Sequence, residues 1–229
     1  MQDQPLIYRF PQSHVDEDPV VISGIGLATS IGKDRESVWR ALQTGQSGIR
    51  HTNSSDGFGD LRLPCGMVDW LGPNSRRLKS VALTDLVADE AIADANIDWS
   101  QVDRQRFACS ISTQFGDIGY TYLDPAVRDQ DPYPESLPKW WQEFLPCSAA
   151  GITGRRLGLY GPRLCHATAC ASGLISTIIA ARMIQDDQAD FALCGAADMV
   201  HELVLASFNR MGVLANQPDA QTAYVARSM

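Results

Sequence analysis

Apolar residues in this chain fall into short continuous runs and into stretches with helical spacing, and the two kinds alternate. Continuous runs suit strands that are covered on both faces, and they lie at 19–29, 106–113 and 190–197. Apolar positions three and four residues apart indicate amphipathic helices, and they lie at 34–44, 76–96, 148–157 and 199–211. This order predicts an α/β fold in which a mostly parallel or mixed sheet has helices on both faces.

Local signals mark the ends of the first helix. Asp34 is a suitable N-cap and Gly45 a suitable stop. The helical spacing places Val38, Trp39 and Leu42 on the inward side. We therefore expect a short surface helix that packs through these three side chains.

Two further stretches leave their interpretation open. Residues 46–73 are rich in Gly, Ser, Asn and Asp, which predicts a long loop with at most a small strand. The next helix starts with Arg76, Arg77 and Lys79, although a helix N-terminus favours anions. These cations either attract an acidic partner or form a solvated basic turn.

The stretch 161–180 joins a strand to an apolar helix through a sharp junction. Residues 163–168 have strand character, and a helix is expected to begin at Ala171. Its side chains are apolar nearly all round, which predicts a buried helix; they include Leu174, Ile175, Ile178, Ile179 and Met183. After this helix, residues 190–197 are predicted to form a buried strand that is central in the sheet.

Cys170 lies at this junction, at the expected N-terminus of the helix. Free N–H groups and the helix dipole at such a position favour a thiolate, which is the nucleophilic form of cysteine. Backbone N–H groups nearby would also bind an oxyanion. We therefore predict Cys170 as a catalytic nucleophile, with oxyanion or turn support from Ala169, Ala171 and Gly173.

Composition narrows the class of protein. The 229 residues carry a net charge of −8, which argues against broad binding to nucleic acid or to anionic membranes. No apolar run reaches the ~20 residues that span a bilayer, and residues 1–18 are a polar stretch, expected to be a flexible tail without the pattern of a signal peptide. We therefore expect a cytoplasmic protein.

Two sequence patterns argue against a zinc or dithiol site and against a dinucleotide cofactor. None of the six cysteines forms a C-x-x-C pair, and Cys109 and Cys194 read as small core residues. Gly24 and Gly26 follow a predicted strand, but Thr29 stands where a dinucleotide fingerprint needs a third glycine. These glycines are better explained by close approach to neighbouring backbone.

The ordered motifs of this chain resemble those of β-ketoacyl-acyl-carrier-protein synthases. The resemblance covers most of residues 18–216 and rests on the motif around Cys170, the residues on either side of it and the opening strand; these are 168–173, 157–162, 189–197 and 20–29. It implies the thiolase-like layered αβαβα fold, of which residues 19–229 would be the N-terminal half. In that family the strand before the nucleophile lies at a subunit contact, which would place residues 164–169 there.

The resemblance also implies a reaction and its partners. An acyl group would pass from acyl-carrier protein to Cys170 as a thioester, and the enolate formed by decarboxylation of malonyl-carrier protein would then attack it. The substrates are carried on phosphopantetheine of the carrier protein, so no cofactor of the enzyme itself is expected. Aromatic residues between 120 and 144 would either line an acyl channel or pack as a cap.

Two catalytic histidines of the family come from motifs in its second half, and neither motif occurs in these 229 residues. None of the histidines present has the matching surroundings; they are His14, His51, His166 and His201. His166 shares a strand face with Cys170 if residues 166–170 are extended, but a buried strand histidine is more often structural. The chain is thus expected to be incomplete alone and to need a complementing C-terminal half, or to act as a homodimer.

Two alternatives remain open. In the first, the chain is a non-catalytic partner subunit that docks carrier protein or a complete synthase. The missing histidines favour this alternative, and Cys170 disfavours it. In the second, the chain is a thiolase-like enzyme that uses the same nucleophile with acyl-CoA. The pathway, whether fatty-acid or polyketide, does not follow from these residues.

Overall fold

The structure, a computed structural model, describes residues 19–53, 62–71, 77–117 and 142–214. The predicted tail at 1–18 and most of the aromatic segment at 120–144 lie outside these residues, and so does the side chain of His51. No helix in the described ranges is both long and apolar enough to pass through a bilayer.

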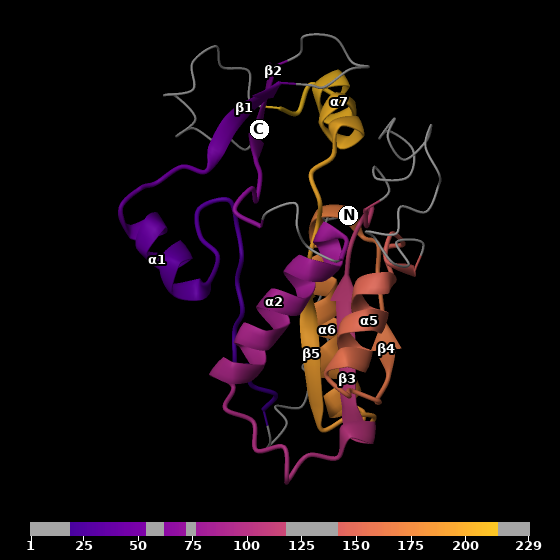
Figure 1. Cartoon of the computed structure of the whole chain (residues 1–229). Helices are drawn as coiled ribbons and strands as arrows, with labels where there is room; N and C mark the ends of the chain where they lie inside the picture. Colours follow the sequence, from indigo (N-terminus) through magenta and orange to yellow (C-terminus); the bar gives the residue numbers. More distant parts are fainter. Residues whose placement is uncertain (1–18, 54–61, 72–76, 118–141, 215–229) are drawn as a thin grey trace, which may run out of the picture.

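Three parallel strands form the main sheet (Figure 1). They are β3 (Phe107–Ser112), β4 (Arg163–Leu164) and β5 (Phe191–Ala196), in the order β4-β3-β5. Residues 107–112 of β3 pair in register with residues 191–196 of β5, and every residue of β3 is buried. The α/β prediction is confirmed, whereas the prediction that the strand near 190 is central is wrong: within the described sheet β3 is central and β5 lies at an edge.

Helices cover the sheet on opposite faces (Figure 1). The helices α2 (Lys79–Asp94) and α5 (Ser148–Arg156) pack on the face of β3 that carries Phe107, Cys109 and Ile111. The helix α6 (Ser172–Gln185) packs on the other face, where Met183 contacts Ala108. This alternation along β3 is the period-two pattern of a strand that is covered on both sides.

The helix α2 receives its N-terminal cap from outside the helix. Its own N-cap residue, Leu78, has no side chain that can accept a hydrogen bond, so Glu143 accepts the Leu78 N–H at 2.8 Å and Asp117 accepts the Ser80 N–H at 3.0 Å. Arg77 lies near Glu143, with nitrogen and oxygen 3.7 Å apart. The described part of the basic turn thus faces carboxylates of the chain itself.

Residues 19–28 do not form the predicted strand. No residue of this segment belongs to a strand, and Val21 and Ile22 are 74% and 75% exposed. Its backbone instead bonds to α2, where Asp94 accepts the Ile25 N–H at 2.9 Å and Glu90 accepts the Leu27 N–H at 2.8 Å. Gly24 and Gly26 press against the α2 backbone, where a Cβ has no room, so close approach explains these two glycines.

The helix α1 (Arg35–Gln43) begins and ends as predicted. The Asp34 side chain accepts the Ser37 N–H at 2.7 Å, and Gly45 has a φ of +67°. Its inward side is partly different from the prediction, because Val38 is buried but Trp39 and Leu42 are 58% and 57% exposed. Nothing among the described residues covers those two side chains.

The remaining elements form a small outer unit near the top of Figure 1. The predicted loop at 46–73 contains an antiparallel hairpin of β1 (Ile49–Asn53) and β2 (Arg62–Gly66). The helix α7 (Glu202–Arg210) lies within its predicted range. Leu63 and Cys65 of β2 pack with Leu205 of α7 in a second core cluster.

The helix α6 is not buried all round, which corrects the prediction. Its buried residues are mostly small: Ser172, Ser176, Ala180 and Met183. Leu174 and Ile178 are 66% and 46% exposed. The sheet therefore contacts the small-residue side of α6, and the outer apolar side has no cover within the described residues.

Candidate functional site

The candidate site lies at the carboxyl edge of the parallel sheet. Cys170 follows β4, Gln114 follows β3 and Asp198 follows β5. Residues that follow neighbouring parallel strands gather at one edge, where open α/β sheets bind ligands. The strand predicted over 163–168 is regular only at Arg163–Leu164, and residues 165–168 lead from it to the turn that carries Cys170.

Cys170 occupies the place that its sequence predicts. A short 3-10 turn, η3 (Ala169–Ala171), precedes α6, and Cys170 is the middle residue of that turn. Cys170 is an exposed residue. A nucleophile must be accessible to its substrate, so this exposure suits the predicted role, which remains a prediction.

The predicted support residues lie in this turn and in the first turn of α6. The Ala171 N–H donates to Thr168 O at 3.1 Å, and the Ala169 carbonyl accepts the Ser172 N–H. Gly173 lies in the first turn of α6, and a Cβ there would make ordinary contact with Ala196 Cβ at 3.5 Å. Ala169 and Ala171 thus contribute hydrogen bonds that hold the turn, whereas Gly173 has room for a side chain.

Gln114 and Asp198 are site residues that sequence reasoning missed. The Gln114 side-chain oxygen accepts the Ala169 N–H at 2.7 Å. The Asp198 carboxylate accepts the Gln114 N–H at 2.7 Å and also the Phe115 N–H. Burial raises the pKa of Asp198, and these two hydrogen bonds oppose that shift. The sequence signal that could have found them is their position, because each is a polar residue soon after a strand of the parallel sheet.

His166 does not pair with Cys170 in the described structure. Its backbone N–H donates to Ser112 Oγ at 3.1 Å. Its Nε2 atom is buried and has no hydrogen-bond partner among the described residues. His166 is therefore half-buried as a residue, although its Nε2 atom is covered, and no described contact makes it a base for the thiol.

Four of the five other cysteines are less exposed than Cys170. Burial raises the pKa of Cys109 to about 12, and burial also raises the pKa of Cys65, Cys165 and Cys194. Cys109 is fully buried, as expected for a core residue. Cys147 is the other exposed cysteine among the six. Exposure alone thus leaves two candidate nucleophiles. Cys147 is the N-cap of α5, whereas Cys170 is the middle residue of the turn that follows β4 and precedes α6.

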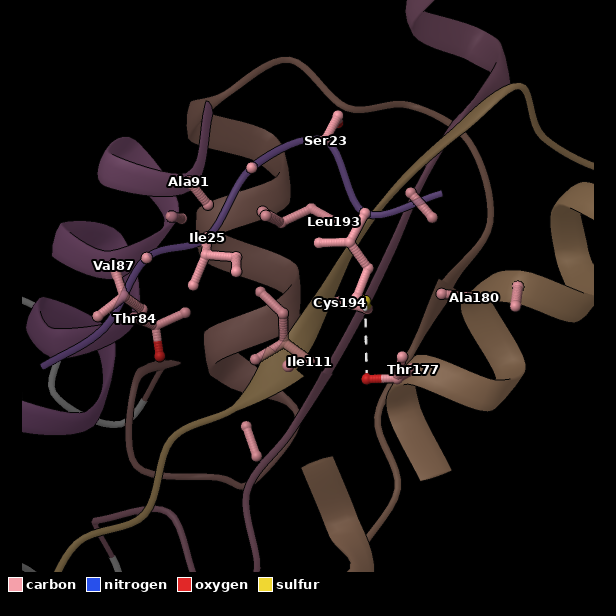
Figure 2. Close-up of a pocket in the computed structure, with 18 of the residues that line it drawn as sticks. Ser23, Ile25, Thr84, Val87, Ala91, Ile111, Thr177, Ala180, Leu193 and Cys194 are labelled. Carbon is pink, nitrogen blue, oxygen red and sulfur yellow. Dashed lines mark hydrogen bonds between the residues drawn. The ribbon is translucent and has the colours of Figure 1, made fainter. Parts of the chain in front are cut away.

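A cavity beside the sheet lies away from this turn. It has a volume of about 500 Å³ and lies between residues 20–26, α2, β5 and α6. Figure 2 shows Ser23 and Ile25 crossing it between Val87 of α2 and Cys194 of β5. The Cys194 Sγ lies 3.9 Å from Thr177 Oγ1. Cys170 does not line this cavity, and no three potential metal ligands gather within the described ranges.

Comparison with known proteins gives the family. Residues 79–228, more than half of the chain, match the family model described as "Beta-ketoacyl synthase, N-terminal domain". The chain belongs to the β-ketoacyl synthase family.

Relatives of this β-ketoacyl synthase chain are about twice as long. The 3-oxoacyl-[acyl-carrier-protein] synthase 2 of Vibrio harveyi is 26% identical over 219 residues, which cover 87% of this chain and 50% of that protein. The chain thus spans about half the length of the curated relatives it matches. The resemblance inferred from the motif around Cys170 is confirmed at the level of the family and of its N-terminal domain.

Solved ketosynthases share the fold. One is a type II polyketide ketosynthase in complex with its acyl-carrier protein, with a TM-score of 0.71, 24% identity, and coverage of 89% of this chain and 52% of that chain. Another is the ishigamide ketosynthase/chain length factor, with a TM-score of 0.69, 25% identity, and coverage of 87% and 51%. The described α/β unit is therefore half of a thiolase-like ketosynthase fold.

Proposed function

We propose that this chain carries the acyl-accepting half of a β-ketoacyl synthase, with Cys170 as the nucleophile. The observation that supports this most is the placement of an exposed thiol in the turn between β4 and α6, at the carboxyl edge of the sheet. An N-terminal helix turn favours a thiolate. Membership of the β-ketoacyl synthase family supplies the reaction class.

The proposed step is transfer of an acyl group between two thiols. The Cys170 sulfur forms a bond to the thioester carbonyl carbon of acyl-carrier protein, and a tetrahedral oxyanion forms. The bond from that carbon to the phosphopantetheine sulfur then breaks. The released phosphopantetheine thiolate takes up the proton that Cys170 lost, so the product is acyl-Cys170 and free carrier-protein thiol.

Backbone N–H groups would stabilise the oxyanion of this step. The Ala169 and Ala171 N–H groups already donate to Gln114 and Thr168, so their proposed contribution is to hold the turn. No described residue accepts a hydrogen bond from the Cys170 N–H. We assign the oxyanion contact to this N–H group.

Condensation would need groups from beyond this chain. The two histidine motifs that would stabilise the malonyl-derived enolate are not in these 229 residues. The apolar outer side of α6, with Leu174 and Ile178 exposed, would pack against the unit that supplies them. We propose a complementing C-terminal half or a second ketosynthase-like subunit as that unit, with acyl-carrier protein as the acyl donor.

A second candidate is a non-catalytic partner subunit. It is favoured by the similarity to solved assemblies of a ketosynthase with its chain length factor. Such a subunit would bind a synthase or carrier protein without becoming acylated. The state of Cys170 after exposure to acyl donors separates the two candidates.

The test is acylation of the purified chain by short and long acyl groups, each presented on carrier protein and on CoA. Peptide mass analysis should find the acyl thioester on Cys170, with carrier protein the faster donor. Cys170→Ala should abolish the adduct, and Cys147→Ala, which removes the other exposed thiol, should not. An equal adduct on both cysteines, or none, would contradict the proposal, and faster transfer from CoA would favour the thiolase-like alternative.

A further inference from the structure

The backbone at Ala169 has a conformation that alanine disfavours. Its φ is +50°, in the left-handed region, where the Cβ of a non-glycine residue is crowded. Such a residue keeps this conformation only when its surroundings hold it there. Because Ala169 directly precedes Cys170, whatever holds Ala169 also sets the direction of the thiol.

Most hydrogen bonds of this turn are local. The Ala171 N–H donates to Thr168 O at 3.1 Å, and the Thr168 N–H donates to Ser172 Oγ at 3.0 Å. One bond links residues 168–172 to another strand within the described structure: the Ala169 N–H donates to Gln114 Oε1 at 2.7 Å. Gln114 therefore connects the strained residue to the end of β3.

Gln114 is itself anchored. Its backbone N–H donates to Asp198 Oδ1 at 2.7 Å, and Asp198 follows β5. The Gln114 amide is half-buried, and it supplies a neutral acceptor beside the thiol turn. The ends of β3 and β5 thus form a fixed support for the turn that follows β4.

We propose that Gln114 is a positioning residue for the nucleophile turn. Its side-chain carbonyl holds Ala169 in the left-handed conformation, and this conformation presents Cys170 at the start of α6. The inference rests on the proposed function of Cys170. An amide suits this role because it accepts the hydrogen bond without placing a negative charge next to a thiolate.

The test measures alkylation of Cys170 by iodoacetamide across pH in the 229-residue chain, with Cys147 of the same molecule as the internal reference. Gln114→Leu should slow alkylation of Cys170 about five-fold, which is the effect of losing roughly one net hydrogen bond. Gln114→Glu keeps the acceptor but adds a charge, so its pH–rate profile should move to higher pH. Gln105→Leu makes the same chemical change at an exposed position at the other end of β3 and should leave both rates unchanged.

A double variant separates positioning from general destabilisation. Glycine adopts positive φ without the steric cost of a Cβ, so Ala169→Gly should restore most of the Cys170 rate that Gln114→Leu loses. If Gln114→Leu alone does not fold, Gln114→Glu is nearly isosteric and tests the proposal by its pH profile. Rates of Cys147 should be the same in every variant.

The outcomes distinguish this inference from the proposed function. If Cys170 of the unmodified chain reacts no faster than Cys147, the proposed nucleophile fails. If Cys170 reacts faster but Gln114→Leu stays within two-fold of the unmodified chain, or Gln114→Glu leaves the pH profile unmoved, the role of Gln114 is overturned. Failure of Ala169→Gly to restore the rate would also overturn the proposed link through Ala169.

Discussion

The two faces of the β3 sheet are built from different kinds of side chain. The face under α2 and α5 holds large apolar groups, among them Phe107, Ile111 and Leu159. The face under α6 holds the small residues Ser110 and Ser112, which are fully buried, as is Ser176 of α6 opposite them. Ser112 and Ser176 join their hydroxyls directly across the interface.

The two faces of the sheet have different roles: the apolar face stabilises the fold, and the small-residue face positions α6. Large apolar side chains on the first face remove much surface from water, which is the main source of folding free energy. Small residues on the second face let α6 approach the sheet closely, and paired hydroxyls fix its register. Because Cys170 stands at the start of α6, that register also fixes the position of the thiol.

The largest expected effect is on the apolar face. Phe107 is 2% exposed, and its ring stacks on Trp99 and Phe191 at centroid distances of 5.8 and 5.5 Å. Phe107→Ala should lower the free energy of unfolding by about 3–5 kcal/mol, measured by urea denaturation. Phe191→Ala, at a ring that is 38% exposed, is the control and should cost clearly less. Equal losses would show that the apolar face is not the main source of stability.

A smaller effect is expected on the face under α6. Ser112 Oγ bonds to Ser176 and accepts the His166 N–H. Ser112→Ala leaves both partners without their bond and should cost about 1–3 kcal/mol. It should also slow alkylation of Cys170, since α6 loses its register.

Ser110→Ala is the matched control on the same strand. The Ser110 hydroxyl is buried with no hydrogen-bond partner among the described residues. Its removal should therefore be close to neutral or slightly stabilising. Equal costs at positions 110 and 112 would mean that the hydroxyl pair does not order this face.

The smallest effect is expected on the outer side of α6. Ile178 is 46% exposed, whereas its neighbour Ile179 packs against the core cluster of Ala108 and Met183. Ile178→Gln should change the free energy of unfolding by less than about 1 kcal/mol, and Ile179→Gln should cost about 2–4 kcal/mol. Thermal and urea unfolding of the two variants would measure this, and similar costs would show that the outer side is covered in the free chain.

Sequence patterns predicted two strands of the main sheet and the ends of α1 well. The runs at 106–113 and 190–197 contain β3 and β5 because each is a short apolar segment between polar residues. The cap at Asp34 and the glycine at 45 fix α1 by local chemistry alone. The position of Cys170 at the start of α6 follows from a local change in pattern as well.

Features that depend on residues distant in the sequence could not be predicted from local patterns. Residues 19–28 are as apolar as β5, but strand pairing needs a partner edge, and α2 carboxylates take their N–H groups instead. Leu174 and Trp39 are apolar, but a residue type does not say whether anything covers it. The bond from Gln114 to Ala169 joins residues 55 positions apart, which no local pattern shows.

The most direct test compares alkylation of Cys170 with that of Cys147 in the folded chain and in urea. Both residues are exposed in the structure, and Cys147 also stands at a helix N-terminus as the N-cap of α5. Accessibility and a helix N-terminus alone therefore predict similar rates in both conditions. If the turn before α6 activates its thiol, Cys170 should react at least about ten-fold faster than Cys147 when folded, and the ratio should approach one when unfolded. A ratio near one in the folded chain would contradict the central claim that this turn makes Cys170 a nucleophile.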